Sequence, residues 1–132
     1  MRVLKPGGLL MIATWCYRNS PPDLSKAEKK YLQSLYDIWA LPFFVSINDY
    51  QQMLQSMILV RHFKSDDWTA PVHQFWWKIF IDNLSLPNII WLIGSGPKIF
   101  FRMMRDLYGL YLMHEGYKKG LIKYGVFAAT KA

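Results

Sequence analysis

The sequence predicts an α/β fold in which helices flank a mixed sheet. An uninterrupted apolar run at residues 9–15 is typical of a strand buried on both faces of a sheet. Residues 26–39 have the apolar spacing of a helix, and residues 58–64 and 124–130 again have the composition of strands. Because three strands cannot easily bury two sheet faces in isolation, this order indicates a sheet that lacks its first strands.

The composition is that of a globular protein and allows one domain at most. Of 132 residues, 52% are apolar, 17% aromatic and 19% charged, which excludes a disordered chain. The net charge of +7 comes without a helix-turn-helix, zinc-finger or RNA-recognition signature, so we expect no nucleic-acid partner. A basic, aromatic-rich surface suits an anionic membrane, and a merely solvated surface is the alternative.

Turn and capping signals set the limits of the first elements. Residues 5–8, Lys-Pro-Gly-Gly, predict a turn before the first strand. Ser25 and Glu28 have the spacing of a capping box that begins the helix at residues 26–39.

A second helix and a second strand are predicted next. Ser46 and Asp49 have the spacing of a helix start, and apolar spacing extends this helix to about residue 57. Residues 58–64 predict the second strand, and residues 66–69 predict a turn after it.

The second half of the chain is aromatic and mainly helical in period. Pro87 and Pro97 interrupt residues 71–106, so we expect two or three short helices there. A longer helix, weakened by glycines, is expected at residues 107–123, before the final strand at 124–130.

Three adjacent aromatic residues, Phe75, Trp76 and Trp77, cannot share one face of a helix, so at least one is expected to point away from its local core. The single cysteine, Cys16, excludes an internal disulfide, and we interpret it as a small buried apolar residue. The histidines show no metal-ligand spacing, so no metal site is predicted.

The segment RVLKPGGLLMIATW resembles the run into the fifth strand of class I S-adenosylmethionine-dependent methyltransferases. The resemblance continues in four further segments: TWCYRN, LPFFVSINDYQQMLQS, SDDWTAPVHQFW and EGYKKGLIKYGVFAATK. In this order the segments resemble the γ-tocopherol methyltransferase branch, which includes related plant and cyanobacterial C- and N-methyltransferases. The ordered set covers essentially the whole chain and is more specific than any one segment.

The resemblance implies a Rossmann-like sheet of which this chain carries the last three strands, with a helical insertion before the final strand. The implied strands are residues 9–14, 58–64 and 124–130, the last antiparallel to its neighbours. The chain would form a single partial methyltransferase domain, residues 1–132. It divides into a strand–helix–strand part at 1–70, the insertion at 71–123 and the final strand at 124–132.

The family binds S-adenosylmethionine in the first half of its domain, through a glycine-rich loop after one strand and an acidic residue after the next. This chain has no Gly-x-Gly-x-Gly segment, and residues 94–97, Gly-Ser-Gly-Pro, follow an aromatic helical stretch instead of a strand. We therefore assign no cofactor-binding residue. The chain is expected to be the carboxyl-terminal half of a methyltransferase that uses S-adenosylmethionine in its full-length form, with no cofactor bound and no activity in this half alone.

The resemblance also implies an apolar small-molecule acceptor, and six residues are expected to contact it. They are Trp15, Tyr17, Trp76, Trp77, Glu115 and Tyr117. For Trp76 and Trp77 the alternative is packing between the helical insertion and the sheet. Trp15 and Tyr17 come at the strand end that faces the ligand crevice of open α/β sheets, and core packing of Trp15 is the alternative. Glu115 either orients an acceptor hydroxyl or belongs to the charges at a helix end. No catalytic residue is identified.

The sequence is compatible with two functions. The first is methyl transfer by the complete parent to a tocopherol-like, phenolic acceptor. The second is a non-catalytic module that binds a membrane surface or another protein. Neither a secretory signal nor an apolar segment long enough to cross a membrane is visible, so we expect a cytoplasmic or plastid, thylakoid-associated location with peripheral membrane association.

Overall fold

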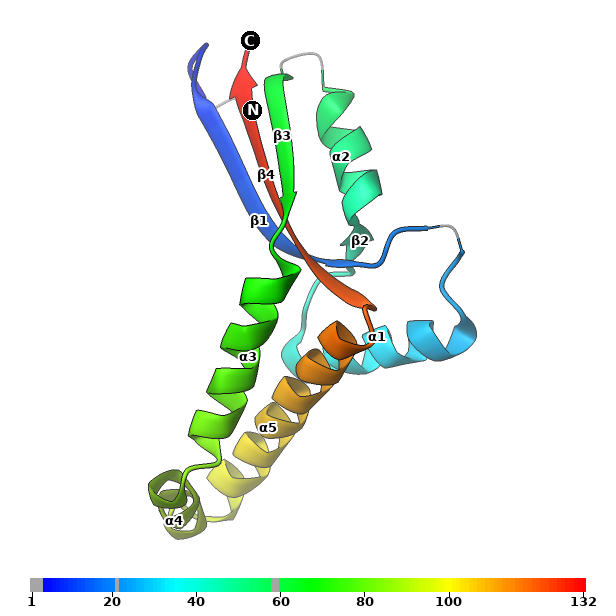
Figure 1. Ribbon diagram of the computed structural model, residues 1–132. Coiled ribbons are helices and arrows are strands. Elements are labelled where there is room, and N and C mark those ends of the chain that lie inside the picture. Colours follow the sequence, from blue (N-terminus) through cyan, green and yellow to red (C-terminus); the bar gives the residue numbers. More distant parts are fainter. Residues whose placement is uncertain (1–3, 21, 58–59) are drawn as a thin grey trace.

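The computed structural model describes residues 4–20, 22–57 and 60–132 and confirms the α/β prediction. The first element along the chain is a strand, the last is also a strand, and the helices lie between them in sequence (Figure 1). In chain order the elements are β1 (Leu9–Tyr17), α1 (Lys26–Trp39), β2 (Val45–Ser46), α2 (Ile47–Gln55), β3 (Val60–Asp67), α3 (Thr69–Asn83), α4 (Leu86–Gly94), α5 (Pro97–Lys118) and β4 (Ile122–Lys131).

The sheet has the strand order β2-β1-β4-β3. β4 is antiparallel to both β1 and β3, as predicted for the last strand, and β2 is parallel to the end of β1. Since β1 and β3 therefore run in the same direction, their carboxyl ends lie at one edge of the sheet. The helices α1, α3 and α5 lie beyond this edge, whereas α2 runs alongside the strands (Figure 1).

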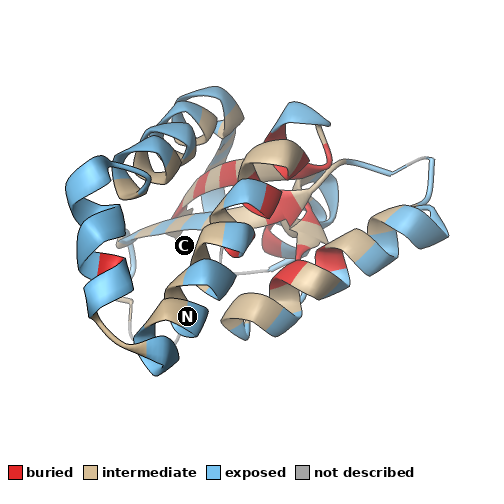
Figure 2. Cartoon of the chain, turned by 90° about the horizontal axis from the view of Figure 1, so that it is seen from below, coloured by how far each residue is buried: buried red, intermediate tan, exposed pale blue. Residues whose placement is uncertain are grey.

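Two clusters of buried side chains hold these elements together. One covers a face of the sheet, where Leu54 of α2 packs with Cys16 and Phe127. The other lies where α1 and α5 meet the start of β4. Its buried members are Leu32, Leu35, Phe44, Leu112, Met113, Tyr117, Leu121 and Ile122. Figure 2 shows the buried residues concentrated where strands and helices meet, while the outer surfaces of the helices are exposed.

The opposite face of the sheet is open along β1. Leu10 and Ile12 pack on the α2 side, so the alternation of a strand directs Leu9 and Met11 to the other side. There Leu9 is 60% exposed and Met11 is 65% exposed. In the described part of the chain, only the last two residues of β1 pair with β2.

Side-chain caps begin α1 and α2 at the predicted residues. Ser25 Oγ accepts a hydrogen bond from the Glu28 N–H at 3.2 Å, and the Glu28 carboxylate accepts one from the Ser25 N–H at 2.7 Å. Arg18 pairs with Glu28 at 2.7 Å, and this contact lowers the pKa of the Glu28 carboxyl to about 2. Ser46 Oγ accepts a hydrogen bond from the Asp49 N–H at 3.1 Å and so caps α2.

The turn predicted at residues 66–69 is wrong. Asp66 and Asp67 are the last residues of β3, and Thr69 is the first residue of α3. The Asp67 carboxylate accepts a hydrogen bond from the Thr69 N–H at 2.8 Å, so strand and helix join without a separate turn. Of the strand predicted at 58–64, the first two residues lie outside the described residues, and the strand extends to Asp67.

The helix predicted at residues 107–123 is wrong at both ends. α5 begins at Pro97 and ends at Lys118, because proline is well tolerated in the first turn of a helix and Pro97 begins one instead of interrupting it. The final strand is confirmed and begins earlier, at Ile122. The short strand β2 was not predicted, since two residues carry no periodicity.

Candidate functional site

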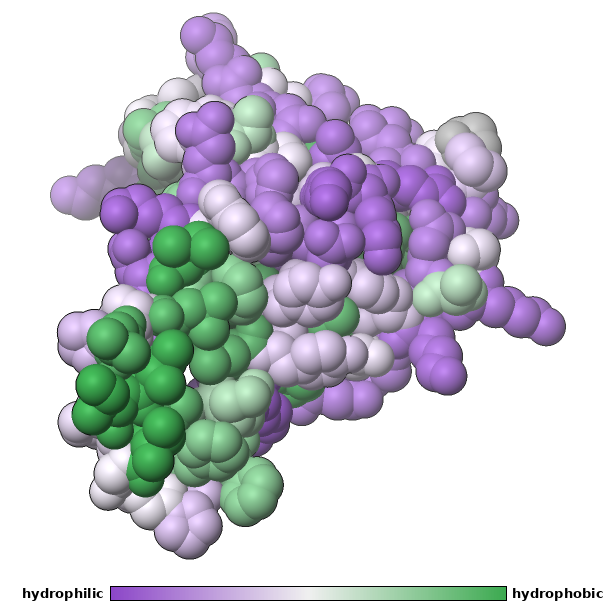
Figure 3. Space-filling model, turned by 60° about the horizontal axis from the view of Figure 1, so that its bottom comes forward, coloured by the Kyte–Doolittle hydropathy of each residue, from purple (hydrophilic) through white to green (hydrophobic). Residues whose placement is uncertain are grey.

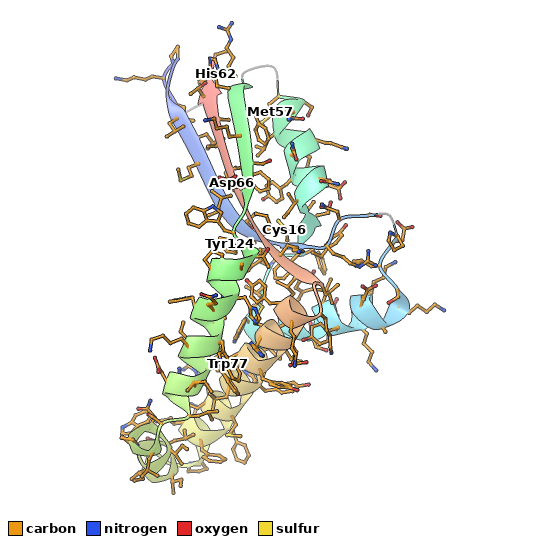
Figure 4. All side chains as sticks on the ribbon, viewed as in Figure 1. Cys16, Met57, His62, Asp66, Trp77 and Tyr124 are labelled. Atoms are coloured by element: carbon orange, nitrogen blue, oxygen red, sulfur yellow. The ribbon has the colours of Figure 1, made fainter. Side chains whose placement is uncertain are left out.

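A cavity of about 330 Å³ opens at the edge of the sheet where β1 ends and β4 begins. Its lining is mostly apolar and aromatic: Ala13, Thr14, Trp15, Pro42, Phe43, Phe44, Val45, Tyr50 and Tyr124. Tyr124 is labelled in Figure 4 at the junction of the sheet and the helices. Ligands of open α/β sheets bind at the carboxyl ends of strands, and their cavities are mainly apolar with a few polar groups. This cavity has both properties.

Trp15 is the centre of an aromatic cluster that connects the end of β1 to α1, α3 and β4. Its ring centroid lies 6.0 Å from that of Trp76 and 6.3 Å from those of Phe44 and Tyr124. Trp76 in turn stacks on Trp39 of α1 at 5.7 Å. Aromatic pairs at such separations stabilise by about 0.5–1.5 kcal/mol beyond their burial. The cluster therefore holds the helical side of the cavity against the sheet.

Two buried polar atoms beside this cluster lack a hydrogen-bond partner among the described residues: the indole Nε1 of Trp15 and the hydroxyl of Tyr117. Tyr117 is only 5% exposed. Burial raises the pKa of the Tyr117 phenol, and the Trp15 indole N–H, which lies close to the hydroxyl but outside hydrogen-bond geometry, acts in the opposite direction. An unsatisfied buried polar group costs about 1–3 kcal/mol. A ligand hydroxyl that reached these atoms would satisfy both, since the indole donates and the phenol can donate or accept.

The structure brings four of the six predicted acceptor residues together. Trp15, Tyr17 and Trp76 pack against the buried cluster between α1, α5 and β4 that contains Tyr117. Tyr17, two residues after Trp15, lines a separate cavity of about 230 Å³ beside α1. Contact of any of these residues with an acceptor stays a prediction.

Trp77 and Glu115 lie outside this group. Trp77 stacks on His114 at 4.2 Å and is 42% exposed, on α3 facing α5 (Figure 4). Because Trp76 packs inward while Trp77 is exposed, the prediction that the adjacent aromatic rings do not share one face is confirmed. Glu115 pairs with Lys118 at 3.8 Å near the end of α5, which fits the alternative that it belongs to the helix-end charges.

Sequence reasoning missed Trp39, Phe44 and Tyr124 as members of the Trp15 cluster. Trp39 belongs to the apolar face that predicted α1, and Tyr124 belongs to the predicted final strand, so each had a local interpretation. The proximity of these rings depends on how α1 and β4 pack, for which no sequence spacing gives a signal.

Two histidines 41 positions apart also meet, between α3 and α5. His73 Nε2 lies 2.9 Å from His114 Nδ1. Burial lowers the pKa of His114, and the charge of His73 lowers it further. Since one imidazole nitrogen can donate while the other accepts, this contact joins the two helices.

Cys16 is fully buried, which confirms its interpretation as a small apolar residue. Burial raises the pKa of its thiol to about 11, so the thiol stays protonated at neutral pH and is a poor nucleophile. Within residues 4–20, 22–57 and 60–132, no group of three His, Cys, Asp or Glu side chains is placed to hold a metal ion.

Solved structures share the fold of the chain, and no protein-family model matches it. The phosphoethanolamine N-methyltransferase 2 of Haemonchus contortus, solved in complex with S-adenosyl-L-methionine, matches with a TM-score of 0.74 at 14% identity, over 98% of this chain and 27% of that one. A geranyl diphosphate methyltransferase in complex with SAM matches with a TM-score of 0.61 at 17% identity, over 98% and 41%. The fold is that of class I S-adenosylmethionine-dependent methyltransferases.

Curated relatives indicate which methyltransferases of this class the chain is related to in sequence. The chloroplastic tocopherol O-methyltransferase of Arabidopsis thaliana is 34% identical over 134 residues, which cover 99% of this chain and 37% of that protein. The 2-methyl-6-phytyl-1,4-hydroquinone methyltransferase of Synechocystis is 31% identical over 133 residues, 99% of this chain and 41% of that protein. The chain is thus a homologue of the tocopherol methyltransferases, and the resemblance seen in its motifs is confirmed. It spans about two fifths of the length of these relatives.

The residues described do not fit S-adenosylmethionine. No glycine lies between β1 and α1 or between β3 and α3, so neither strand end has the small residues that let a backbone approach a cofactor. Gly94 ends α4 and Gly96 precedes α5, at the end of the molecule far from the sheet (Figure 1). We therefore derive no step through this cofactor for the residues described.

Proposed function

We propose that this chain is the acceptor-binding, carboxyl-terminal half of an S-adenosylmethionine-dependent methyltransferase whose acceptor is an apolar, phenolic, tocopherol-like small molecule. The single observation that carries the proposal is the position of the Trp15 cluster, with its unpartnered indole N–H and Tyr117 hydroxyl, beside an aromatic cavity at the carboxyl edge of the sheet. The names of the relatives, which specify tocopherol and a phytyl hydroquinone, support this class of acceptor.

In this proposal the residues of the chain bind and orient the acceptor. Trp15 and Trp76 bury its ring, and the indole N–H of Trp15 and the hydroxyl of Tyr117 bind its phenolic hydroxyl. Positioning of this kind contributes to methyl transfer because the reacting atoms must be held in line and close together. Tyr17, Trp77 and Glu115 are secondary candidates, since Tyr17 lines a separate cavity beside α1 and the other two lie outside the Trp15 cluster.

The proposal also holds that the chain does not transfer methyl groups alone, since its described residues do not fit the cofactor. In this proposal the chain is one partial methyltransferase domain, which consists of a strand–helix–strand part at 1–70, a helical insertion at 71–123 and a final strand at 124–132. We also propose a plastid location for this chain, because the name of the Arabidopsis relative describes that protein as chloroplastic.

A binding titration tests the acceptor site. Tocopherol in mixed micelles should quench the tryptophan fluorescence of the wild-type chain, and Tyr117→Phe should weaken binding by about tenfold, as expected for one lost buried hydrogen bond. Tyr108→Phe, an exposed tyrosine on the same helix, is the matched control and should bind like the wild type. Equal affinities for the two variants would refute the role of Tyr117.

A second titration tests the cofactor part of the proposal. Calorimetry of S-adenosylmethionine against the chain alone should show no heat of binding. Micromolar affinity would contradict the view that the chain lacks a cofactor site.

A second candidate function is a non-catalytic module that binds a membrane surface or another protein. Exposed apolar side chains on α4, next to basic residues of α5, favour it. Peripheral membrane association is compatible with both functions, because an acceptor with a long apolar tail resides in membranes.

A further inference from the structure

The α4 tip is an exposed apolar surface at the end of the molecule opposite the sheet (Figure 1). We define it by five side chains that are each between 60% and 70% exposed: Leu86, Ile90, Trp91, Ile93 and Phe101. Within α4, Leu92 is the buried residue. Figure 3 shows hydrophobic side chains gathered into one patch over this part of the molecule. An apolar patch of this kind marks a site of contact with a partner or a membrane.

The charged residues within the stretch that forms the α4 tip are all positive, and the nearby Asp82, at the end of α3, pairs with Lys78. The sequence has no acidic residue between Asp82 and Asp106, while Lys98, Arg102 and Arg105 lie in this stretch. Lys98 and Arg102 have no ion-pair partner among the described residues, whereas Arg105 pairs with Asp106 at 3.1 Å.

The basic residues and the apolar tip share one side of α5. Positions 98, 101, 102 and 105 have the spacing of a single helical face, so Lys98, Arg102 and Arg105 flank Phe101. Such a face presents an apolar ring to a bilayer and cationic groups to its phosphates at the same time.

We infer that the α4 tip docks on the surface of an anionic lipid bilayer, with the apolar side chains of α4 and Phe101 in the interfacial region and Lys98 and Arg102 on lipid phosphates. α4 has nine residues, too few to span a bilayer, and none of the helices described has the length and apolarity that crossing requires. The inference rests on the membrane association proposed above and is independent of the acceptor site.

A groove of the protein begins at the basic residues of α5 beside the tip. It has a volume of about 630 Å³ and lies between α1 and α5, and its lining includes Trp39 and Trp76 together with Arg102, Arg105, Asp37 and Asp106. Trp76 also contacts Trp15 at the proposed acceptor site. Through Trp76 the groove is therefore in contact with the end of β1.

A second copy of the chain is a less suitable occupant of the tip. A symmetric dimer places the same patch of both copies face to face. It would bring Lys98 and Arg102 of both copies together with no acidic residue of this stretch to balance them. Lipid phosphates supply the missing negative charge.

Vesicle co-sedimentation of the full chain tests the inference. Vesicles of two parts phosphatidylcholine and one part phosphatidylglycerol should bind the chain, and pure phosphatidylcholine should bind it at least about tenfold less, because each basic residue near an anionic surface contributes about fivefold. Binding should weaken at high salt. Ile90→Glu with Ile93→Glu, and separately Lys98→Glu with Arg102→Glu, should each reduce the partition coefficient at least about tenfold.

Two control pairs change the net charge equally at other exposed places. Leu9→Glu with Met11→Glu matches the apolar pair in exposure, and Lys26→Glu with Lys30→Glu on α1 matches the basic pair. The partition coefficients of both controls should stay within about twofold of the wild-type value, and circular dichroism should show that all variants are folded.

Equal losses of binding in the control and tip variants would overturn the inference. It would also be overturned if the chain did not bind anionic vesicles but formed a dimer that Ile90→Glu with Ile93→Glu abolished. Neither methyl donor nor acceptor is present, so failure here leaves the proposed acceptor site standing.

Discussion

Helix α5 is buried in its carboxyl half and exposed in its amino half, although both halves are rich in apolar residues. In the carboxyl half, Met113 is completely buried and Tyr117 nearly so, against α1 and the start of β4. In the amino half, Ile99, Phe101 and Met104 are exposed next to α4. The two halves differ less in composition than in the elements that lie beside them.

Two glycines allow the close packing of the carboxyl half. A Cβ on Gly109 would lie 2.8 Å from the Trp39 ring, and a Cβ on Gly116 would overlap the Ile122 side chain. α1 and β4 can therefore approach the backbone of α5 at these two positions. Burial along this helix therefore follows the approach of a neighbouring element and not the number of apolar residues.

The largest effect is expected from truncation in the buried half. Met113→Ala should lower the free energy of unfolding by about 2–5 kcal/mol, because it removes buried atoms and leaves a cavity. Met104→Ala, in the exposed half, should change it by no more than about 0.5 kcal/mol. Urea unfolding followed by circular dichroism measures both, and similar losses would contradict the contrast between the halves.

Gly116→Ala tests the close packing directly. It should lower the free energy of unfolding by about 1–3 kcal/mol through overpacking against Ile122, although alanine is the better helix former by about 1 kcal/mol. Gly94→Ala on α4 is the control, because a Cβ there meets nothing within 4 Å, and it should be neutral or stabilising. A stabilising Gly116→Ala would show that the helix and β4 can move apart at no cost.

Tyr117→Phe should raise the free energy of unfolding by about 1 kcal/mol, because it removes a buried hydroxyl without a described partner and keeps the ring. Tyr108→Phe should leave it unchanged, since Tyr108 is exposed. The midpoints of thermal unfolding without ligand measure the difference. A destabilised Tyr117→Phe would mean that the hydroxyl is already satisfied in the free protein, which would also weaken its proposed role in acceptor binding.

The smallest expected effect is a dependence of stability on pH through His114. Its pKa is lowered in the folded chain, first by burial and then by His73, so protons bind the unfolded chain more strongly. The contribution of His114 to the free energy of unfolding is complete above the usual histidine pKa of about 6.5. It is lost as the pH falls through the lower pKa that His114 has in the folded chain. Glu115 and Lys118 on α5 and Trp77 on α3 surround it.

Urea midpoints measured from neutral pH downward should fall in the wild type, and this fall should be smaller in His114→Gln. The Arg18–Glu28 pair does not interfere, because its contribution is lost only as the pH falls below the usual glutamate value toward about 2. An unchanged pH profile in His114→Gln would show that the histidine pair is not coupled to folding.

The predictable features were those with local causes. The Ser25–Glu28 capping box lies within one helical turn, and the apolar run that became β1 needs only its own composition. The aromatic cluster around Trp15 was only partly predictable, because Trp39 and Trp76 reach it from helices whose packing no local pattern specifies.

By itself, the sequence determined the α/β class, the capped starts of α1 and α2, the positive stretch between Asp82 and Asp106, and the kinship with tocopherol methyltransferases. Only the tertiary structure decided that Trp76 joins Trp15 while Trp77 does not, and that one half of α5 is buried while the other carries the α4 tip. The physical reason is that caps and strands depend on interactions between near neighbours in the chain. Burial depends on which distant element comes close enough to exclude water.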